Sequence, residues 1–447
     1  MSAYADRLEA LAADAADRCT GCGKCFEACP TAREIGLDAG EAKARVGELS
    51  ALTLNGGPAA EGLQKWLNAC DGSARCSAAC PEDINVRQWV TIAKMKALDA
   101  ARPREVGAAN AAGRFRHMAQ AVRLLASMQL PSETLKKILQ PAERRTAEIL
   151  FYTGCNVLRT PHIVLNVMDI LDALELDFDV VGGTSHCCGV YQFQEADLPT
   201  YERMGHRTFQ RFGQSGASKV LTWCPTCTKN FDELEKDVEE PFFDLGHVSE
   251  FLAANLKALK ARFVDQPKRR VVIHEHLGIG ATVDSIRKLL SAVPNLELVE
   301  LVQDSGFSYA CGGQAAKFKD RERAIHRGLA EGAVAAGADT IVTMYHSCHR
   351  ALAGAEAVYP SLRVVNFTDI LAEALGRGGH PDYYRLYKAG GSMDEAVAAA
   401  RQFLSSNGVR VDEASVQSLT ADIFDETGLA GSRDAFAQAF TALAKEG

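Results

Sequence analysis

The chain has 447 residues, of which 47% are hydrophobic and 24% charged, and it contains 14 cysteines. This is ordinary globular composition, so a disordered or fibrous chain is excluded, and the length predicts about three domains. No run of 18 apolar residues occurs, which argues against a membrane-spanning helix. A net charge of −8 makes general nucleic-acid binding a poor expectation.

The N-terminal segment, residues 1–16, is polar and rich in alanine, and the sequence predicts a helix here. It carries neither the apolar run nor the small-residue cleavage site of a signal peptide. We therefore expect a cytoplasmic protein, with contact at the inner face of the membrane as its only membrane association. Disulfides rarely persist in that compartment, so clustered cysteines indicate metal or redox chemistry.

The first cysteine run has the spacing C-x2-C-x2-C-x3-C-P, which is the bacterial ferredoxin pattern for a [4Fe–4S] cluster. Two-residue gaps let a loop wrap a cubane so that one thiolate reaches each corner. Zinc on a C-x2-C pair is the minor alternative. The run consists of Cys19, Cys22, Cys25 and Cys29.

The second run, Cys70, Cys76 and Cys80, has Ser73 where a cysteine is expected. In two-cluster ferredoxins the last cysteine of each run serves the other cluster. That rule assigns Cys19, Cys22, Cys25 and Cys80 to one cluster, and Cys29, Cys70 and Cys76 to a second, with Ser73 at the vacant corner.

Three thiolates favour a [3Fe–4S] cluster at this second position. A [4Fe–4S] cluster whose fourth iron takes serine or water is the alternative. The second run resembles the last cysteine motif of succinate dehydrogenase iron–sulfur subunits, where three cysteines at this spacing hold a [3Fe–4S] cluster. Residues 41–68 between the runs have helical periodicity, so the sequence predicts a mostly α-helical ferredoxin-type domain over residues 1–100.

A basic segment follows, with nine Lys or Arg against three Glu between residues 102 and 145. Residues 115–128 are amphipathic at helical spacing. We predict connector helices over residues 101–147 that pack on the next domain. The alternative is a docking face for an acidic partner or a membrane surface.

Residues 216–227 and 337–348 align without gaps at an offset of 121, which indicates an internal repeat. In the first copy, short apolar strands at 148–153, 178–181 and 219–222 alternate with helices near 163–174 and 201–212. This order predicts an α/β body with parallel strand pairing and cysteines at strand ends. We expect the copies to span residues 148–260 and 261–376, followed by a small helical domain at 377–447.

The first copy carries five cysteines in the pattern C-x31-C-C-G-x34-C-x-x-C, with Gly189 after the adjacent pair. Five thiolates are one more than a cubane needs, and adjacent cysteines cannot easily cap two corners of one cube. The pattern therefore predicts a centre other than a simple cubane. Its cysteines are Cys155, Cys187, Cys188, Cys224 and Cys227.

This five-cysteine unit resembles the cysteine-rich CCG domain of heterodisulfide reductase B-type subunits, and the N-terminal block resembles the C-type subunit. The fusion is similar to the D-type subunit and to the iron–sulfur subunits of glycolate, lactate and anaerobic glycerol-3-phosphate dehydrogenases. The resemblance covers roughly residues 19–372. It implies that the five cysteines are the ligands of a noncubane [4Fe–4S] cluster, the catalytic centre that cleaves a disulfide in the heterodisulfide reductases.

The second copy departs from this family pattern. The positions of Cys155, Cys187 and Cys224 become His276, Ala310 and Tyr345, and only Cys311 and Cys348 remain. A zinc or mononuclear iron site that includes His276, Cys311 and Cys348 is one interpretation. A repeat that has lost its metal and is kept for its fold is the other.

No Gly-x-Gly-x-x-Gly after a strand and no P-loop occurs, so the sequence offers clusters without an evident hydride acceptor. Our first hypothesis is an iron–sulfur electron-transfer subunit of a complex. Its partners would be a flavoprotein dehydrogenase and a quinone or other carrier. The second hypothesis is a thiol–disulfide reductase acting at the noncubane centre, and the third is a redox-sensing binding module. In the tail, residues 392–395 resemble a capping box before a helix at 396–404.

Overall fold

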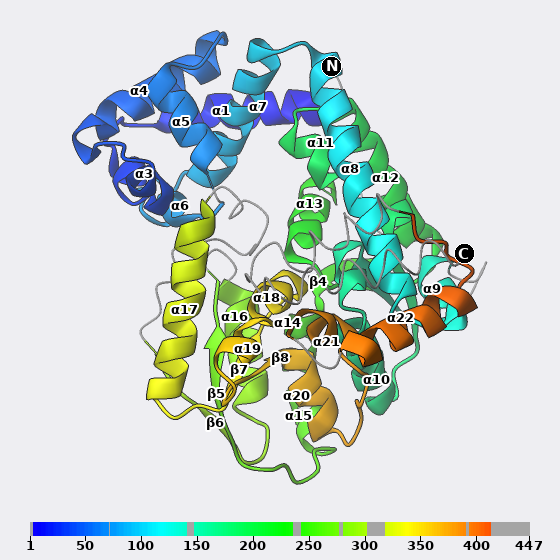
Figure 1. Ribbon diagram of the computed structural model, residues 1–447. Coiled ribbons are helices and arrows are strands. Elements are labelled where there is room, and N and C mark those ends of the chain that lie inside the picture. The colour runs from blue at the N-terminus through cyan, green and yellow to red at the C-terminus, as the bar shows by residue number, and fades with distance from the viewer. Residues whose placement is uncertain are drawn as a thin grey trace.

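The computed structural model describes residues 3–70, 72–140, 147–235, 243–276, 280–301, 318–389 and 393–412. It consists of an N-terminal helical domain, a long connector helix and two α/β units, with C-terminal helices against the second unit (Figure 1). This confirms the predicted fold class of two repeated α/β units behind a helical domain. Cys311, the capping box at 392–395 and the tail after residue 412 lie wholly or partly outside the described residues.

The N-terminal domain is built from short helices around an apolar centre that includes Leu63, Trp66 and Trp89. The region 41–68, expected to be helical, is two helices, because Gly56 and Gly57 have φ of 67° and 88° and end the first. The elements are α1 (Ala3–Arg18), α2 (Lys24–Glu27), α3 (Pro30–Glu34), η1 (Ala39–Glu41), α4 (Ala42–Asn55), α5 (Glu61–Ala69), α6 (Arg75–Ala78) and α7 (Val86–Ala101).

The basic segment forms α8 (Arg104–Ser127) and α9 (Ser132–Leu139). The apolar side of α8, with Met118, Val122 and Leu125, is buried. Met118 and Val122 belong to the core of the α/β units. The amphipathic pattern is therefore explained by packing, as predicted for a connector.

The first unit has a four-stranded parallel sheet in the order β2-β1-β3-β4. The fourth strand, which the sequence did not predict, is only four residues long and adds an edge beside β3. The elements are β1 (Ile149–Gly154), η2 (Asn156–Arg159), α10 (His162–Ala173), β2 (Phe178–Gly182), η3 (Thr184–His186), α11 (Val190–Gln194), α12 (Leu198–Gln214), β3 (Lys219–Thr222), α13 (Pro225–Glu235), β4 (Asp244–His247), α14 (Val248–Ala254) and α15 (Leu256–Lys260).

The second unit repeats this sheet with the order β6-β5-β7-β8, again parallel. The register repeats as well, because Thr222 pairs with His247 and Thr343 with Asn366. The elements are β5 (Arg269–His274), α16 (Gly280–Leu290), β6 (Leu296–Leu298), α17 (Lys319–Ala335), β7 (Thr340–Thr343), α18 (His346–Leu352), α19 (Ala355–Val358), β8 (Arg363–Asn366) and α20 (Phe367–Ala374), followed by α21 (Tyr383–Ala389) and α22 (Met393–Ser406).

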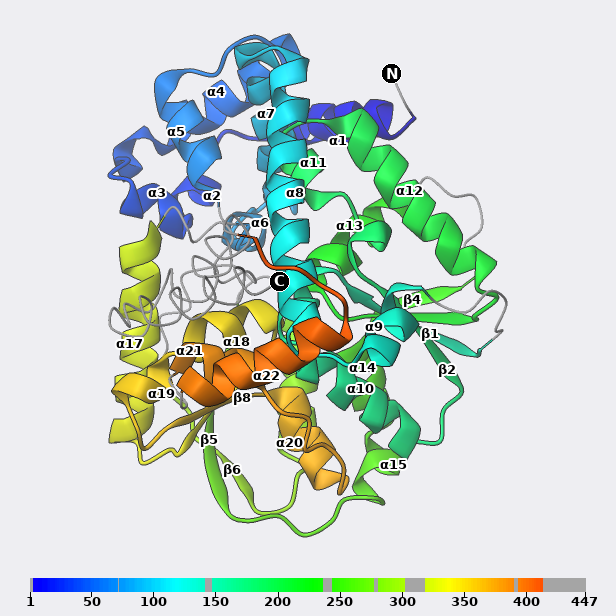
Figure 2. The ribbon, with the colours of Figure 1, turned by 45° about the vertical axis from the view of Figure 1, so that its right-hand side comes forward.

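The helical domain sits over the carboxyl ends of the strands rather than apart from the sheets, as Figures 1 and 2 show. One apolar cluster contains Leu8 and Trp66 from this domain together with Tyr201 and Phe231 from the first unit. The rings of Tyr4 and Tyr201 lie 5.3 Å apart across this boundary. On the other side, Arg321 of α17 forms an ion pair with Glu34 of α3. Both α/β units therefore contact the helical domain.

Candidate metal centres

Four cysteines of the helical domain surround one hollow of about 310 Å³, a volume that includes space open to solvent. Val46 and Trp89 complete its apolar wall. Burial raises the pKa of Cys25 to about 12, and the three other thiols of the set raise it further. A cationic iron centre would offset that cost, so these donors fit a cluster. We name them set 1: Cys19, Cys22, Cys25 and Cys80.

Set 2 consists of Cys29, Cys70 and Cys76. Burial raises the pKa of Cys76 to about 12, and the thiols of Cys70 and Cys29, then of Cys25, raise it further. Cys25 of set 1 therefore lies close to set 2. In addition, the indole N–H of Trp66 donates to the Cys29 sulfur at 3.3 Å. The two thiol sets are neighbours and divide the cysteines as the ferredoxin rule predicts.

The loop that carries Ser73 has the backbone of the loop that carries Cys22. Gly21 and Gly23 have φ of 67° and 84°, and the matching Gly72 and Ala74 have 79° and 59°. Each loop then enters a four-residue helix, α2 or α6. Ser73, which is buried, thus occupies the position that Cys22 takes in set 1.

The five cysteines of the first unit follow the carboxyl ends of three neighbouring strands. Cys155 comes directly after β1, the adjacent pair follows β2 through η3, and Cys224 and Cys227 follow β3. The strand order places β1 and β3 side by side at the reversal of the sheet, where α/β proteins place their sites. We call this group the five-cysteine site.

Sulfur contacts connect the five-cysteine site. Cys227 and Cys188 are 3.5 Å apart between their sulfur atoms, and the Gly189 N–H donates to the Cys187 sulfur at 3.4 Å. Contact with the Cys187 thiol, to which burial adds, raises the pKa of Cys188 to about 12. Five packed thiols cannot all ionise without a cation, so this donor set fits an iron–sulfur cluster.

Two backbone features explain how these thiols approach one another. Gly154 has φ of 75°, and a Cβ added to it would lie 3.5 Å from the Cys227 sulfur. Gly189 has φ of 82°, and an added Cβ would come within 3.0 Å of Tyr201. A side chain at either position would crowd this end of the sheet.

Sequence reasoning missed two polar residues that line the five-cysteine site. The amide of Asn230 donates to the Cys188 sulfur at 3.6 Å, and the hydroxyl of Tyr152 lies 3.9 Å from the Cys227 sulfur. Tyr152 is otherwise anchored, since its hydroxyl donates to the His186 carbonyl at 2.5 Å. Neither belongs to a cysteine pattern. Their only signals are the place of Tyr152 in an apolar strand and the three-residue spacing from Cys227 to Asn230 on one helix.

In the second unit the positions of Cys155 and Cys227 hold His276 and Cys348, and these side chains meet. The Nε2 atom of His276 lies 2.8 Å from the Cys348 sulfur. With the ring of His274 they form a buried trio whose ligand atoms all lie within 4.8 Å of one another. We call this trio the His–Cys site. Cys311 lies outside the described residues.

The two units meet through the side chains that replace or adjoin cluster positions. The indole N–H of Trp223 donates to Nδ1 of His346 at 3.2 Å, and Trp223 stacks on Phe367 at 5.7 Å between ring centroids. Tyr345, which stands at the position of Cys224, packs on Trp223 and His276. The repeat positions thus face each other across the boundary.

Comparison with known proteins agrees with this layout. The family described as "4Fe-4S dicluster domain" matches residues 15–84, and the family described as "Cysteine-rich domain", CCG, matches residues 149–232 and 277–353. The D-type chain of dihydromethanophenazine:CoB–CoM heterodisulfide reductase from Methanosarcina mazei is 27% identical over 245 residues. The chain is a heterodisulfide reductase-like iron–sulfur protein.

A second relative is the B-type chain of fumarate reductase (CoM/CoB) from Methanothermobacter marburgensis, 25% identical over 343 residues. The matches cover 52% and 74% of this chain, and 59% and 66% of the heterodisulfide reductase and fumarate reductase relatives respectively. The chain therefore spans about three fifths to two thirds of the length of these relatives. Both are reductase subunits by name, and both matches indicate an iron–sulfur subunit.

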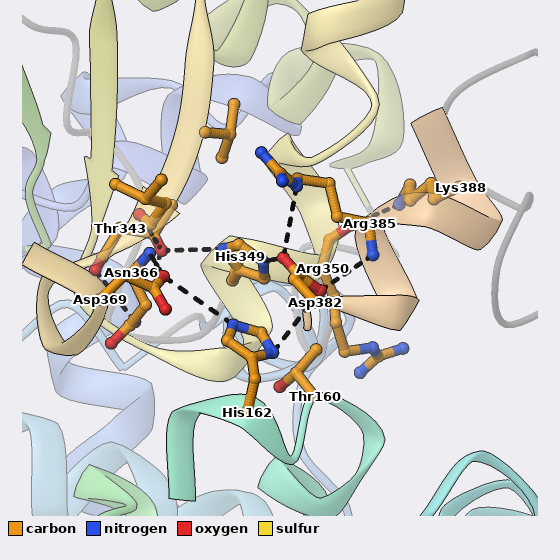
Figure 3. Close-up of polar contacts among 12 residues, drawn as sticks. Thr160, His162, Thr343, His349, Arg350, Asn366, Asp369, Asp382, Arg385 and Lys388 are labelled. Carbon is orange, nitrogen blue, oxygen red and sulfur yellow. Dashed lines mark hydrogen bonds and ion pairs between the residues drawn. The ribbon is translucent and has the colours of Figure 1, made fainter. Parts of the chain in front are cut away.

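A further buried polar group lies behind the His–Cys site, where α10, α18 and α21 meet (Figure 3). The Nε2 atom of His349 lies 2.6 Å from Asp382, and Nδ1 of His162 lies 3.5 Å from the same carboxylate. Arg385 approaches Asp382 to 3.7 Å. This network ties α21 to both units.

Proposed function

We propose that this chain is the iron–sulfur subunit of a reductase complex that carries electrons between a flavoprotein partner and the five-cysteine site. A quinone or another carrier would complete the exchange outside the chain. The proposal rests on the similarity to reductase subunits and on one structural observation, which is the apolar core shared by all three cysteine groups. We expect no nucleic-acid partner, in line with the net charge of −8.

The shared core supports a continuous route. Cys25 of set 1 and Cys188 and Cys227 of the five-cysteine site belong to one buried cluster, and Cys29, Cys70 and Cys76 of set 2 pack against it. No solvent-filled gap between domains would then have to be crossed, because Tyr4 and Tyr201 close the boundary. Bound clusters would supply one-electron chemistry at the three groups.

The protein side chains have separate tasks in this arrangement. Cysteines of set 1, set 2 and the five-cysteine site would hold the groups, and Ser73 would adjoin set 2. Trp66 and Asn230 donate hydrogen bonds to sulfur atoms and would stabilise the thiolate form of Cys29 and Cys188. Tyr152, fully buried, keeps water from the inner side of the five-cysteine site.

The route can be tested with prereduced flavodoxin, an FMN protein, as a probe donor to the anaerobically reconstituted full chain. Freeze-quench paramagnetic resonance would follow reduction at the five-cysteine site. We expect Cys22→Ala to slow this step at least tenfold, because it removes a thiolate from the entry domain. Dithionite, a small reductant, should still reduce the site in the variant.

Cys348→Ser is the matched control, since it removes a buried cysteine that lies outside the proposed route. It should leave the rate of reduction by flavodoxin unchanged. Equal rates in Cys22→Ala and the unmodified chain would contradict the relay. So would oxidation of an organic substrate by the isolated chain without any partner.

A thiol–disulfide reductase is the second candidate, and one observation favours it. Cys224 is partly exposed, whereas the other four cysteines of the five-cysteine site are buried. A disulfide substrate would therefore approach at Cys224. The relative from Methanosarcina mazei is named for heterodisulfide reduction.

This candidate is tested by supplying the isolated chain with reduced benzyl viologen and a small asymmetric disulfide. Release of thiols that is lost in Cys224→Ser would establish catalysis at this site. Absence of thiol release, together with transfer from flavodoxin, would leave the relay.

A further inference from the structure

The His–Cys site occupies the position in the second unit that the five-cysteine site occupies in the first. His274 ends β5, His276 follows it by two residues, and Cys348 lies in α18 after β7. Because β5 and β7 are neighbours in the sheet, the ends of two central strands bring the trio together. The same reversal of strand order that places Cys155 and Cys227 therefore places His276 and Cys348.

The donor atoms have the spacing of a metal site. A tetrahedral zinc ion with imidazole and thiolate ligands separates nitrogen from sulfur by roughly 3.6 Å, given bond lengths near ~2.0 and ~2.3 Å. The three donor atoms here lie within 4.8 Å of one another, and the shortest separation is the 2.8 Å between His276 and Cys348. Opening that contact by less than about 1 Å would admit the ion.

The chemistry of the donors selects the ion. Two imidazoles and one thiolate are typical of zinc, whereas a cluster of the first-unit type would require more thiolates. All three side chains are buried, and His274 also packs edge-on against the ring of His326, at 5.4 Å between centroids. That packing fixes the orientation of the first imidazole.

The second buried group, His162, His349 and Asp382, is less suited to a cation. Its carboxylate already accepts from His349 at 2.6 Å, and the guanidinium of Arg385 stands 3.7 Å away. A positive side chain at that distance opposes a divalent ion. The His–Cys site has an uncharged donor set instead.

We propose that His274, His276 and Cys348 bind a structural zinc ion, which replaces the cluster of the first unit and joins the ends of β5 and β7. This inference is independent of the proposed electron route. The second unit is then a copy that has exchanged its metal, rather than a decayed one. A site of this kind would contribute directly to folding stability.

The test uses the full chain, reconstituted anaerobically with iron and sulfide so that the other cysteine groups are engaged. Zinc chloride is then added, the protein is desalted, and zinc and iron are measured together by plasma mass spectrometry. We expect one zinc per chain. His276→Ala and Cys348→Ser should each lower bound zinc at least tenfold while iron content is unchanged, and His206→Ala, on α12, should retain it.

Zinc-edge X-ray absorption separates this site from adventitious binding to cysteines. The proposal requires a mixed nitrogen and sulfur shell, and His276→Cys should keep the zinc with one additional sulfur. That rescue also covers the case in which the alanine variant fails to fold. An all-sulfur shell in the unmodified chain, or equal zinc in His276→Ala and the unmodified chain, would overturn the proposal.

Discussion

At the scale of single residues, the two ferredoxin loops show that backbone conformation and ligand identity are separable. Gly23 and Ala74 both have a left-handed conformation before a short helix, although only glycine adopts it without strain. A Cβ at Gly23 would lie 2.9 Å from the Cβ of Ala42, so glycine is also required by packing there. The loop at Ser73 has kept its shape while it lost its thiol.

We predict that Ser73→Cys converts the second ferredoxin centre. As-isolated protein should show the paramagnetic resonance signal of an oxidised [3Fe–4S] cluster, because three thiolates leave one corner without a ligand. The variant should lose that signal and gain one iron per chain. Ser73→Ala is the control and should keep the signal. Four-iron stoichiometry at both ferredoxin sites in the unmodified chain would refute the assignment.

The cysteine pairs of the two units should respond differently to substitution. Cys188 is buried and touches both Cys227 and Asn230, so Cys188→Ala should abolish the noncubane signal and its iron. Cys311→Ala should leave every cluster signal intact. Loss of iron equivalent to a whole cluster in Cys311→Ala would show that the second unit also holds a cluster.

At the scale of elements, strand ends place the donors and helices lock the units together. The network of His162, His349 and Asp382 joins α10 of the first unit to α18 and α21, as Figure 3 shows. Burial alone lowers the pKa of His349, but the Asp382 carboxylate outweighs it and the net pKa is raised. Burial opposes ionisation of Asp382, yet His162 and His349 hold its pKa well below its usual range.

These opposite shifts predict a pH window for the network. The raised pKa of His349 stabilises the fold below about pH 6.5, and this contribution fades as pH rises through the folded pKa. The lowered pKa of Asp382 stabilises it above about pH 4 and fails in stronger acid. Asp382→Asn should therefore cost about 2 kcal/mol near pH 5.5 and less near pH 8.5.

Thermal unfolding followed by circular dichroism at both pH values would measure this difference. Asp169→Asn is the matched control, because Asp169 pairs with His380 at 2.9 Å in a partly exposed position. Its effect should be within ~1 kcal/mol at either pH. A cost for Asp382→Asn that does not change with pH would mean that His349 is neutral in the fold.

At the scale of the whole molecule, the helical domain and the first unit share one core. Tyr4 is 2% exposed and contacts Tyr201, while Leu11 of the same helix is 36% exposed. Within the described residues, no helix has both the length and the apolar character needed to cross a membrane. The domain is therefore held by internal burial, and its cysteines keep a fixed position relative to the five-cysteine site.

We predict that Tyr4→Ala loosens this boundary. Removing a fully buried aromatic side chain typically costs about 3 to 5 kcal/mol. Hydrogen exchange followed by mass spectrometry should show faster exchange in α1 and α12, with little change in β5 and β7. Leu11→Ala, on the exposed side of α1, should leave exchange unchanged. Protection that is equal in both variants would contradict a shared core.

Much of the fold followed from local pattern. Cysteine spacing divided the ferredoxin thiols into the two groups that the structure brings together, and alternating strands and helices predicted the parallel sheets. The edge strands β4 and β8 escaped prediction because four-residue segments carry little periodicity. The helix over 41–68 was wrong as one element, because two consecutive glycines outweigh the apolar pattern around them.

The sequence by itself determined which residues bear the chemistry, because ligand spacing along a loop is a local property of the chain. Only the tertiary structure decided which of them meet. The contact of His276 with Cys348 joins residues 72 positions apart, and Trp223 reaches His346 over 123. Asn230 and Tyr152 gained their places beside sulfur from the packing of α13 and β1. Such long-range contacts depend on sheet order and domain packing, which no local spacing specifies.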